Sequence, residues 1–242
     1  MTTIIASNKQ FIAGDSLWTN RQDEPVNKTL RKYVSINEEI TYFSGDEYPI
    51  LFEQAQILGF ISEATYLELQ TQLDENEQFA SIVFEMKDGR FLKEESSGFE
   101  CLNSIIHSGS GGENAAQFYI NQLDSDTKQR IDNAMNFTFA LDPCSGGHIT
   151  KTVWESGSRL FDNTQITDLN YEQEIKNQIE YLLDIISKYN DVTGGSTMSA
   201  TLVSPSRTSP TVNAPKVDIE LAKKRLAARK ARLAKKATEE KK

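Results

Sequence analysis

Thr2-Thr3-Ile4-Ile5-Ala6-Ser7 is a run of β-branched and small residues that predicts a short strand. Asn8 and Lys9 suit a tight turn, and the mainly apolar stretch 10–15 returns as the partner strand. The chain is therefore expected to open with a β-hairpin.

The first residue of this stretch, Thr2, is also a candidate catalytic nucleophile. Removal of Met1 would leave Thr2 with a free α-amine and a hydroxyl, which together form a nucleophile and its own base. An α-amine has an ordinary pKa of about 7.7–8.0, so part of it is the neutral base at neutral pH. Such a matched base commonly contributes about 10²–10⁴-fold in rate. A plain first strand would begin in the same way, so this pattern alone does not decide between the two readings.

Beyond this hairpin, strands come in antiparallel runs and helices in consecutive pairs. The regular alternation of strand and helix that builds a parallel sheet is missing, which favours an α+β fold. Further strands are expected at 32–36, 40–44, 79–92 (as a hairpin around Asp88-Gly89), 105–107 and 148–154. Helices are expected within 47–73 (two, the second capped by Ser62), from near Glu113, from Ser125 or Asp126, and over 171–189. The polar stretch 20–28 is expected to be a loop.

Two of these helices carry an apolar face that predicts their buried side. In the helix beginning near Asp126 the apolar face consists of Ile131, Ala134, Met135 and Phe139. In the helix over 171–189 it consists of Ile175, Ile179, Leu182, Leu183 and Ile186.

The composition is typical of a globular body with polar extensions. The 242 residues are 38% hydrophobic and 25% charged, a size for one large domain or two small ones. Cys101 and Cys144 make neither a disulfide framework nor a metal-binding pair. We therefore expect the protein to lie in a reducing compartment, the cytoplasm, and to bind no metal and no cofactor. No secretory signal or membrane-spanning stretch is expected. The net charge is −9 although basic residues gather at the end, and this acidic body argues against nucleic acid as its ligand.

Two glycine-containing turns are candidate functional segments. Gly109-Ser110-Gly111-Gly112 leads from a strand into a helix, where its amides are able to form an anion nest. It lacks the lysine of a phosphate-binding loop, and Glu113 places negative charge where a phosphate would lie. The second turn spans residues 142–147. Tight backbone geometry is the simpler interpretation of both turns, and a surface ion pair is the simpler interpretation of Asp15 with Lys32.

Taken together, these segments resemble the proteasome and HslV family of threonine peptidases, which are N-terminal nucleophile hydrolases. The turn at 109–112 is most similar to that of bacterial HslV, and the turn at 142–147 to that of proteasome β-subunits. The resemblance implies a four-layer αββα sandwich over residues 1–190. It covers about residues 2–155 and rests on Thr2-Thr3-Ile4-Ile5-Ala6, Ile12-Ala13-Gly14-Asp15-Ser16, Lys32 before a strand, Ser44-Gly45 after the next one, and the two turns.

The resemblance also implies roles. Thr2 would be the nucleophile with its amine as the base, Lys32 would favour proton loss, and Asp15 would pair with Lys32. The Gly45 amide would stabilise the oxyanion, and the reaction would be amide hydrolysis through an acyl-threonine ester. The family further implies a homo-oligomeric ring, peptide or unfolded protein as substrate, and an ATP-driven unfoldase as partner. Ser110, Asp142 and Ser145 would hold the terminal amine and its proton.

Two features favour a second hypothesis, a catalytically silent structural subunit of a viral particle or another large complex. Asp46 follows Gly45 and would oppose the charge of an oxyanion unless it points away or is paired. If Met1 stays, the free amine moves by one residue, up to about 3.5 Å away. The presence of all six polar or charged site residues together favours the peptidase.

The end of the chain departs from the family pattern. Residues 191–216 are rich in Ser, Thr and Pro and are expected to form a flexible linker. Residues 217–242 are basic and are expected to be helical, either as a solvated tail or as a tether to an acidic partner, a neighbouring subunit or nucleic acid. The apolar stripe of this tail consists of Ile219, Ala222, Leu226, Leu233 and Ala237.

Overall fold

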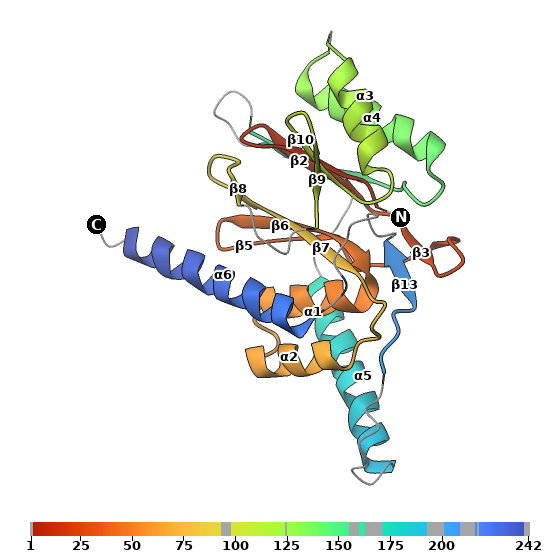
Figure 1. Cartoon of the computed structure of the whole chain (residues 1–242), viewed down its shortest axis with the longest axis vertical. Coiled ribbons are helices and arrows are strands. Elements are labelled where there is room, and N and C mark those ends of the chain that lie inside the picture. The colour runs from red at the N-terminus through yellow and green to blue at the C-terminus, as the bar shows by residue number, and fades with distance from the viewer. Residues whose placement is uncertain are drawn as a thin grey trace.

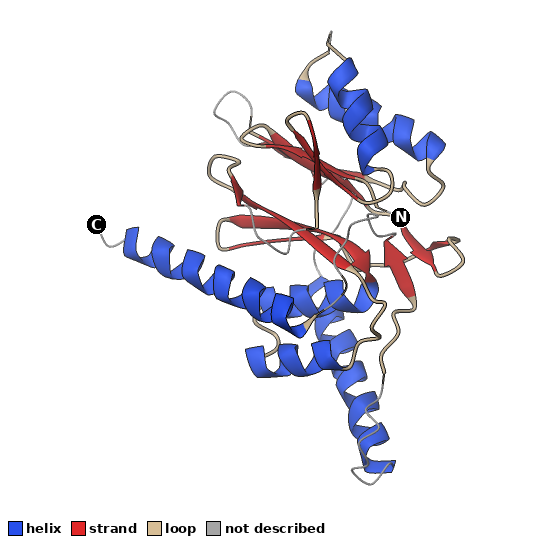
Figure 2. Cartoon of the chain, in the orientation of Figure 1, coloured by secondary structure: helices blue, strands red, loops and turns tan. Residues whose placement is uncertain are grey.

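The computed structural model describes residues 2–92, 98–123, 125–154, 160–162, 171–192, 201–208, 216 and 218–239. Two antiparallel sheets stack face to face, and helices cover the outer face of each (Figures 1 and 2). The predicted α+β class and the four layers in αββα order are both confirmed.

The first sheet contains the N-terminal hairpin. Its strand order is β12-β11-β2-β1-β10-β9, and β1 pairs with β2 so that Ile4 lies opposite Gly14. The three-residue strands β9 and β12 extend the two edges and are not predicted from the sequence pattern. The strands are β1 (Ile4–Ser7), β2 (Phe11–Asp15), β9 (Glu100–Leu102), β10 (Ile105–Ser108), β11 (Ile149–Val153) and β12 (Leu160–Asp162).

The second sheet is built around the long strand β6. Its order is β4-β3-β13-β6-β7-β8, and β5 pairs with the earlier part of β6 on the same edge as β13. The stretch 20–28, expected to be a loop, holds the turn and second strand of a small β3–β4 hairpin. The strands are β3 (Trp18–Asn20), β4 (Pro25–Val26), β5 (Tyr33–Ile36), β6 (Glu39–Asp46), β7 (Phe79–Glu85), β8 (Phe91–Leu92) and β13 (Ser206–Thr208).

The helices form the two outer layers. α3 and α4 cover the first sheet, and α1, α2, α5 and α6 lie against the second (Figure 2). The predicted cap of α2 is present, since the Ser62 hydroxyl accepts the Thr65 amide (3.1 Å). The Asp126 carboxylate caps α4 in the same way by accepting the Gln129 amide (2.9 Å). The helices are α1 (Glu47–Ile57), α2 (Glu63–Thr71), α3 (Gly112–Asn121), α4 (Thr127–Leu141), α5 (Tyr171–Val192) and α6 (Ile219–Glu239).

Three apolar cores separate the four layers. Between the sheets, Ile4, Ile12 and Ile106 pack with Ile40 and Phe84. The predicted apolar faces of α4 and α5 pack into the outer two cores, where Phe139 is only partly buried. The prediction for Leu183 is wrong, because this residue is 37% exposed. It directly follows the buried Leu182, and a step of about 100° turns it off the apolar stripe.

Part of the expected linker is an ordered segment. Residues 201–208 are extended against the body, with Leu202 in the core beneath the second sheet and β13 inside that sheet. Hydroxyl groups that suggest a linker in the sequence instead bond buried carboxylates, Ser204 to Glu77 and Ser206 to Glu47. The rest of 191–216 lies largely outside the described residues.

The basic tail forms α6, which packs on α2 and the second sheet. Ala222 and Leu226 are buried as the stripe predicts, whereas Ala237 is exposed near the end of the helix. Several basic groups have acidic partners in the same chain: Arg232 lies 3.2 Å from Glu39. Another such pair is Lys230 with Glu63 (2.7 Å).

Candidate active site

Thr2 lies immediately before β1 and is completely buried. Among the described residues, its Oγ1 atom has no hydrogen-bond partner. Leaving a buried hydroxyl unpaired costs free energy, so such a group calls for an explanation, and a role in a reaction is one.

Gly109 is what lets the chain approach Thr2 so closely. It has φ +83°, and a Cβ at this position would lie 1.8 Å from the Thr2 carbonyl oxygen. Only glycine fits such a contact in this conformation. The Gly109–Gly112 turn therefore packs against the start of β1, in agreement with the interpretation as tight backbone geometry.

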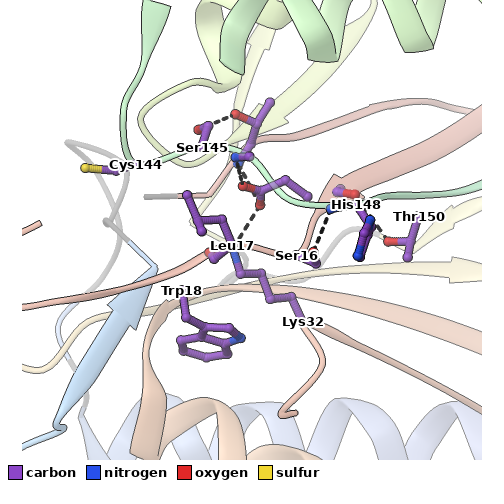
Figure 3. Close-up of polar contacts among 12 residues, drawn as sticks. Ser16, Leu17, Trp18, Lys32, Cys144, Ser145, His148 and Thr150 are labelled. Carbon is purple, nitrogen blue, oxygen red and sulfur yellow. Dashed lines mark hydrogen bonds and ion pairs between the residues drawn. The ribbon is translucent and has the colours of Figure 1, made fainter. Parts of the chain in front are cut away.

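A buried ion pair lies next to this residue. Lys32 precedes β5 and places its Nζ 2.9 Å from Asp15 Oδ1, at the end of β2, and it also donates to the Leu17 carbonyl (Figure 3). The two side chains are only 2% and 0% exposed, so this is not a surface pair. Asp15 Oδ1 also accepts the Thr3 amide (3.3 Å), which brings the lysine next to the residue after Thr2.

Burial acts on both members of the pair. It raises the pKa of Asp15 and lowers the pKa of Lys32, because each charged form loses hydration, while the partner's charge opposes both shifts. The second Asp15 oxygen accepts the Gly146 amide at 2.9 Å, which further supports the carboxylate. The pair thus holds a desolvated ammonium group at the end of β2.

The three remaining polar site residues also meet. Asp142 Oδ2 accepts the hydroxyls of Ser110 and Ser145, each at 2.7 Å. The Ser145 hydroxyl in turn lies 2.7 Å from the Thr3 hydroxyl. The two glycine-containing turns are therefore linked to one another and to the first strand through Thr3.

Gly45 lies in β6 and has φ +128°. Its neighbour Ser44 bonds Ser108 of β10 at 2.8 Å, and Ser108 precedes Gly109, which touches Thr2. This chain of contacts connects Gly45 to Thr2 across the two sheets. The Asp46 carboxylate accepts the Gln78 amide at 2.6 Å and is buried, so it is paired toward β7.

A cavity of about 710 Å³ borders the ion pair. Its described lining includes Asp15, Lys32, Arg31, His148 and Tyr171, but not Thr2. Within the described ranges, no cluster of three or more His, Cys, Asp or Glu side chains is placed to hold a metal ion. No helix in that part of the chain is long and apolar enough to cross a membrane.

The structure brings together residues that the sequence does not single out. Thr3 contacts both Asp15 and Ser145, and Ser44 with Ser108 bridges the sheets. Thr3 is conspicuous only as the second of two threonines, and the two serines only through their places at strand ends. Their partners lie far away in sequence, and no local pattern reports such contacts.

Similarity to known proteins is found in structure and not in sequence. No protein-family model matches the sequence, and no curated protein matches it either. Among solved structures, the chain is similar to HslV from Trypanosoma brucei, a eukaryotic HslV, with 20% identity and a TM-score of 0.41. The similarity covers 62% of this chain and 97% of the HslV chain.

Proposed function

We propose that the chain is a threonine-type peptidase whose nucleophile is the Thr2 hydroxyl, exposed together with its α-amine by removal of Met1. One observation carries the proposal: the buried Thr2 Oγ1 is unpaired among the described residues and adjoins two polar networks. Those networks are the Asp15–Lys32 pair and the Ser110–Asp142–Ser145 cluster, both reached through Thr3.

In this reaction, Thr2 Oγ1 bonds the substrate carbonyl carbon while its proton passes to the Thr2 amine. The substrate C–N bond then breaks, the leaving amine takes that proton, and an acyl-threonine ester remains. Water adds to the ester with the amine as base, which releases the acid product and restores Thr2. The charge of Lys32 favours the deprotonated forms of both groups of Thr2.

The oxyanion of the tetrahedral intermediate would be stabilised by the Gly45 amide. One such donor is commonly worth about 3–4 kcal/mol. The pairing of Asp46 with Gln78 supports this role, because a carboxylate that accepts an amide toward β7 opposes the developing charge less.

A catalytically silent structural subunit is the second candidate. The complete burial of Thr2 favours it, because a substrate cannot reach a hydroxyl closed on all sides. Within either proposal we infer assembly into a homo-oligomeric ring, with unfolded protein as the peptidase's substrate. Exposed apolar side chains at the α3–α4 layer, Leu123 and Leu141, would suit a subunit contact.

The test combines intact mass with covalent labelling. A peptidase gives a native mass lacking Met1 and a covalent adduct on Thr2 after long incubation with a peptide electrophile directed at an amine and hydroxyl. Thr2→Ala should remove the adduct without unfolding the chain, whereas Thr2→Ser, which keeps both groups, should retain it. Retention of Met1 in the native protein would favour the structural subunit.

A further inference from the structure

The strand β13 lies between β3 and β6 in the second sheet, two strands that come much earlier in the chain. It pairs antiparallel with β3 on one side, where Ser206 lies opposite Asn20. On the other side it pairs antiparallel with β6, where Thr208 lies opposite Gly45. In Figure 1 the blue arrow of β13 lies beside the red β3 although nearly the whole chain separates them in sequence.

The direction of the Gly45 amide follows from its neighbours on β6. Phe43 donates its amide to the Lys32 carbonyl on one edge of the strand (2.8 Å), and Asp46 donates to the Gln78 carbonyl on the other (2.8 Å). Successive amides of a strand alternate between its edges, so Gly45 shares the edge of Phe43. Near Gly45, that edge is occupied by β13.

The segment leading into β13 is held by buried polar contacts. Side chains alternate between buried and exposed from residue 201 to 206, with Leu202, Ser204 and Ser206 inward. The Ser204 hydroxyl donates to Glu77 and accepts the Tyr48 amide at 2.9 Å, and its own amide donates to Glu77 at 2.8 Å. The Ser206 hydroxyl donates to the buried Glu47.

An extended peptide that adds itself to two strand edges gains main-chain hydrogen bonds on both sides. The gap between β3 and β6 is such a position, and a peptide carbonyl lying in it would face the Gly45 amide. Thr2 is connected to that point through the Ser44–Ser108 bridge. The groove is therefore placed to present an extended peptide to the candidate nucleophile.

We propose that residues 202–208 occupy the peptide groove of the chain in place of substrate, so that the folded protein is closed until this segment leaves. The inference rests on the proposed peptidase function. It places the segment on the strand edge toward which the Gly45 amide points, while the polar network around Thr3 is assembled. The ligand class of the groove is an extended peptide with small hydroxyl side chains opposite Glu77 and Glu47.

The test uses the full chain with Ser204→Ala and Ser206→Ala combined, which removes two hydroxyl donors to buried carboxylates. The matched control is Val203→Ala, on the same segment but with a side chain 47% exposed. Intact mass must first show the same Met1 state in all three proteins, and thermal unfolding must show that they are folded. The readouts are the labelling rate of Thr2 by a peptide electrophile and the binding of a fluorescent synthetic peptide with the sequence of residues 201–208.

The double variant should label roughly tenfold faster or more than the parent and bind the added peptide roughly tenfold more tightly, because each lost bond is to a charged group. Val203→Ala should match the parent. Equal labelling and equal peptide binding in parent and double variant would overturn the occlusion. Tighter peptide binding without labelling in any variant would support occupation of the groove and refute the peptidase.

If the double variant fails to fold, Ser206→Ala alone with the same two readouts replaces it. An unchanged exchange rate of the Gly45 amide in a folded variant would also overturn the proposal, since that amide faces the occupied edge.

Discussion

The Ser44 hydroxyl of β6 lies 2.8 Å from the Ser108 hydroxyl of β10, and this hydrogen bond joins the two sheets directly beside the candidate site. Both residues are buried. Each stands next to a glycine with positive φ: Gly45 in β6, and Gly109 directly after β10. The bond therefore fixes the spacing between the expected oxyanion donor and the nucleophile.

Removal of either hydroxyl from this bridge should destabilise the fold. Ser44→Ala and Ser108→Ala should each lower the free energy of unfolding by about 1–3 kcal/mol, because the remaining buried hydroxyl loses its partner in the other sheet. The double variant should cost clearly less than the two single effects added together. Urea unfolding measures all three, with the exposed Ser35→Ala as control. Additive effects would show that the two hydroxyls are not coupled.

The Asp15–Lys32 pair should behave as a unit. Lys32→Met leaves a buried carboxylate without its partner and should cost about 3–5 kcal/mol in the free energy of unfolding. Asp15→Asn combined with Lys32→Met should recover part of that loss, since no isolated charge remains. Denaturant unfolding is the measurement, and Lys9→Met at the exposed hairpin turn is the control. A double variant less stable than Lys32→Met would contradict a coupled pair.

Glu77, which accepts hydrogen bonds from Ser204, makes the stability of the fold depend on pH. Burial raises the pKa of Glu77 from its ordinary 4.5, against the hydrogen bonds of Ser204 and the charge of Arg21. The folded chain then binds the proton more readily than the unfolded chain, so this group adds stability as the pH falls through the folded pKa. That gain is complete below the ordinary value and is lost as the pH rises.

The stability of the parent relative to Glu77→Gln should therefore increase as the pH is lowered from 7 toward 4.5. Urea unfolding of both proteins across this range gives the difference, in which other titrating groups cancel. The neighbouring exposed Glu75→Gln serves as control. A difference that shrinks on acidification would mean that the pKa of Glu77 is depressed in the fold.

Gly109 and Gly59 form a matched pair for testing the contact with Thr2. Both have positive φ, +83° and +76°, but a Cβ at Gly59 meets nothing within 4 Å, whereas one at Gly109 meets the Thr2 carbonyl. Gly59→Ala should cost roughly 1–2 kcal/mol from backbone strain alone. Gly109→Ala should cost more and should also slow labelling of Thr2. Equal costs in thermal or urea unfolding would argue against the close contact.

The C-terminal helix should contribute to the stability of the body. Leu226→Ala removes a buried side chain from the core and should cost about 2–5 kcal/mol. Lys223→Ala, on the exposed face of the same helix, should be nearly neutral. Urea unfolding compares the two. If neither variant changes the midpoint, the segment is a solvated tail rather than a part of the fold.

Most of the fold can be predicted because its signals are local. The first hairpin has alternating apolar residues around a turn, and Ser62 and Asp126 cap helices whose period is visible. The site residues could be proposed because they fall at the ends of strands or in glycine turns. Their convergence is a property of the stacked sheets, and only the structure reports that Thr3 joins the two networks.

β13 could not be predicted because its signal is not local. The stretch around it is rich in serine, threonine and proline, as a linker is. The roles of Ser204 and Ser206 depend on Glu77 and Glu47, which lie more than a hundred residues earlier. The prediction for Leu183 fails for a smaller reason, because this residue lies a single step around the helix from the buried Leu182. The strands β9 and β12 are only three residues long, too short for alternation to be recognised.

The position of β13 also sets an order of events during synthesis on the ribosome. β3 and β6 emerge early, whereas the strand that joins them is translated after all the other described strands. Until then the nascent protein presents two unpaired strand edges, which invite pairing with other chains. A message truncated before codon 206 would therefore yield a product in which both strand edges stay unpaired, and chaperone demand should fall once residues 206–208 have left the ribosome.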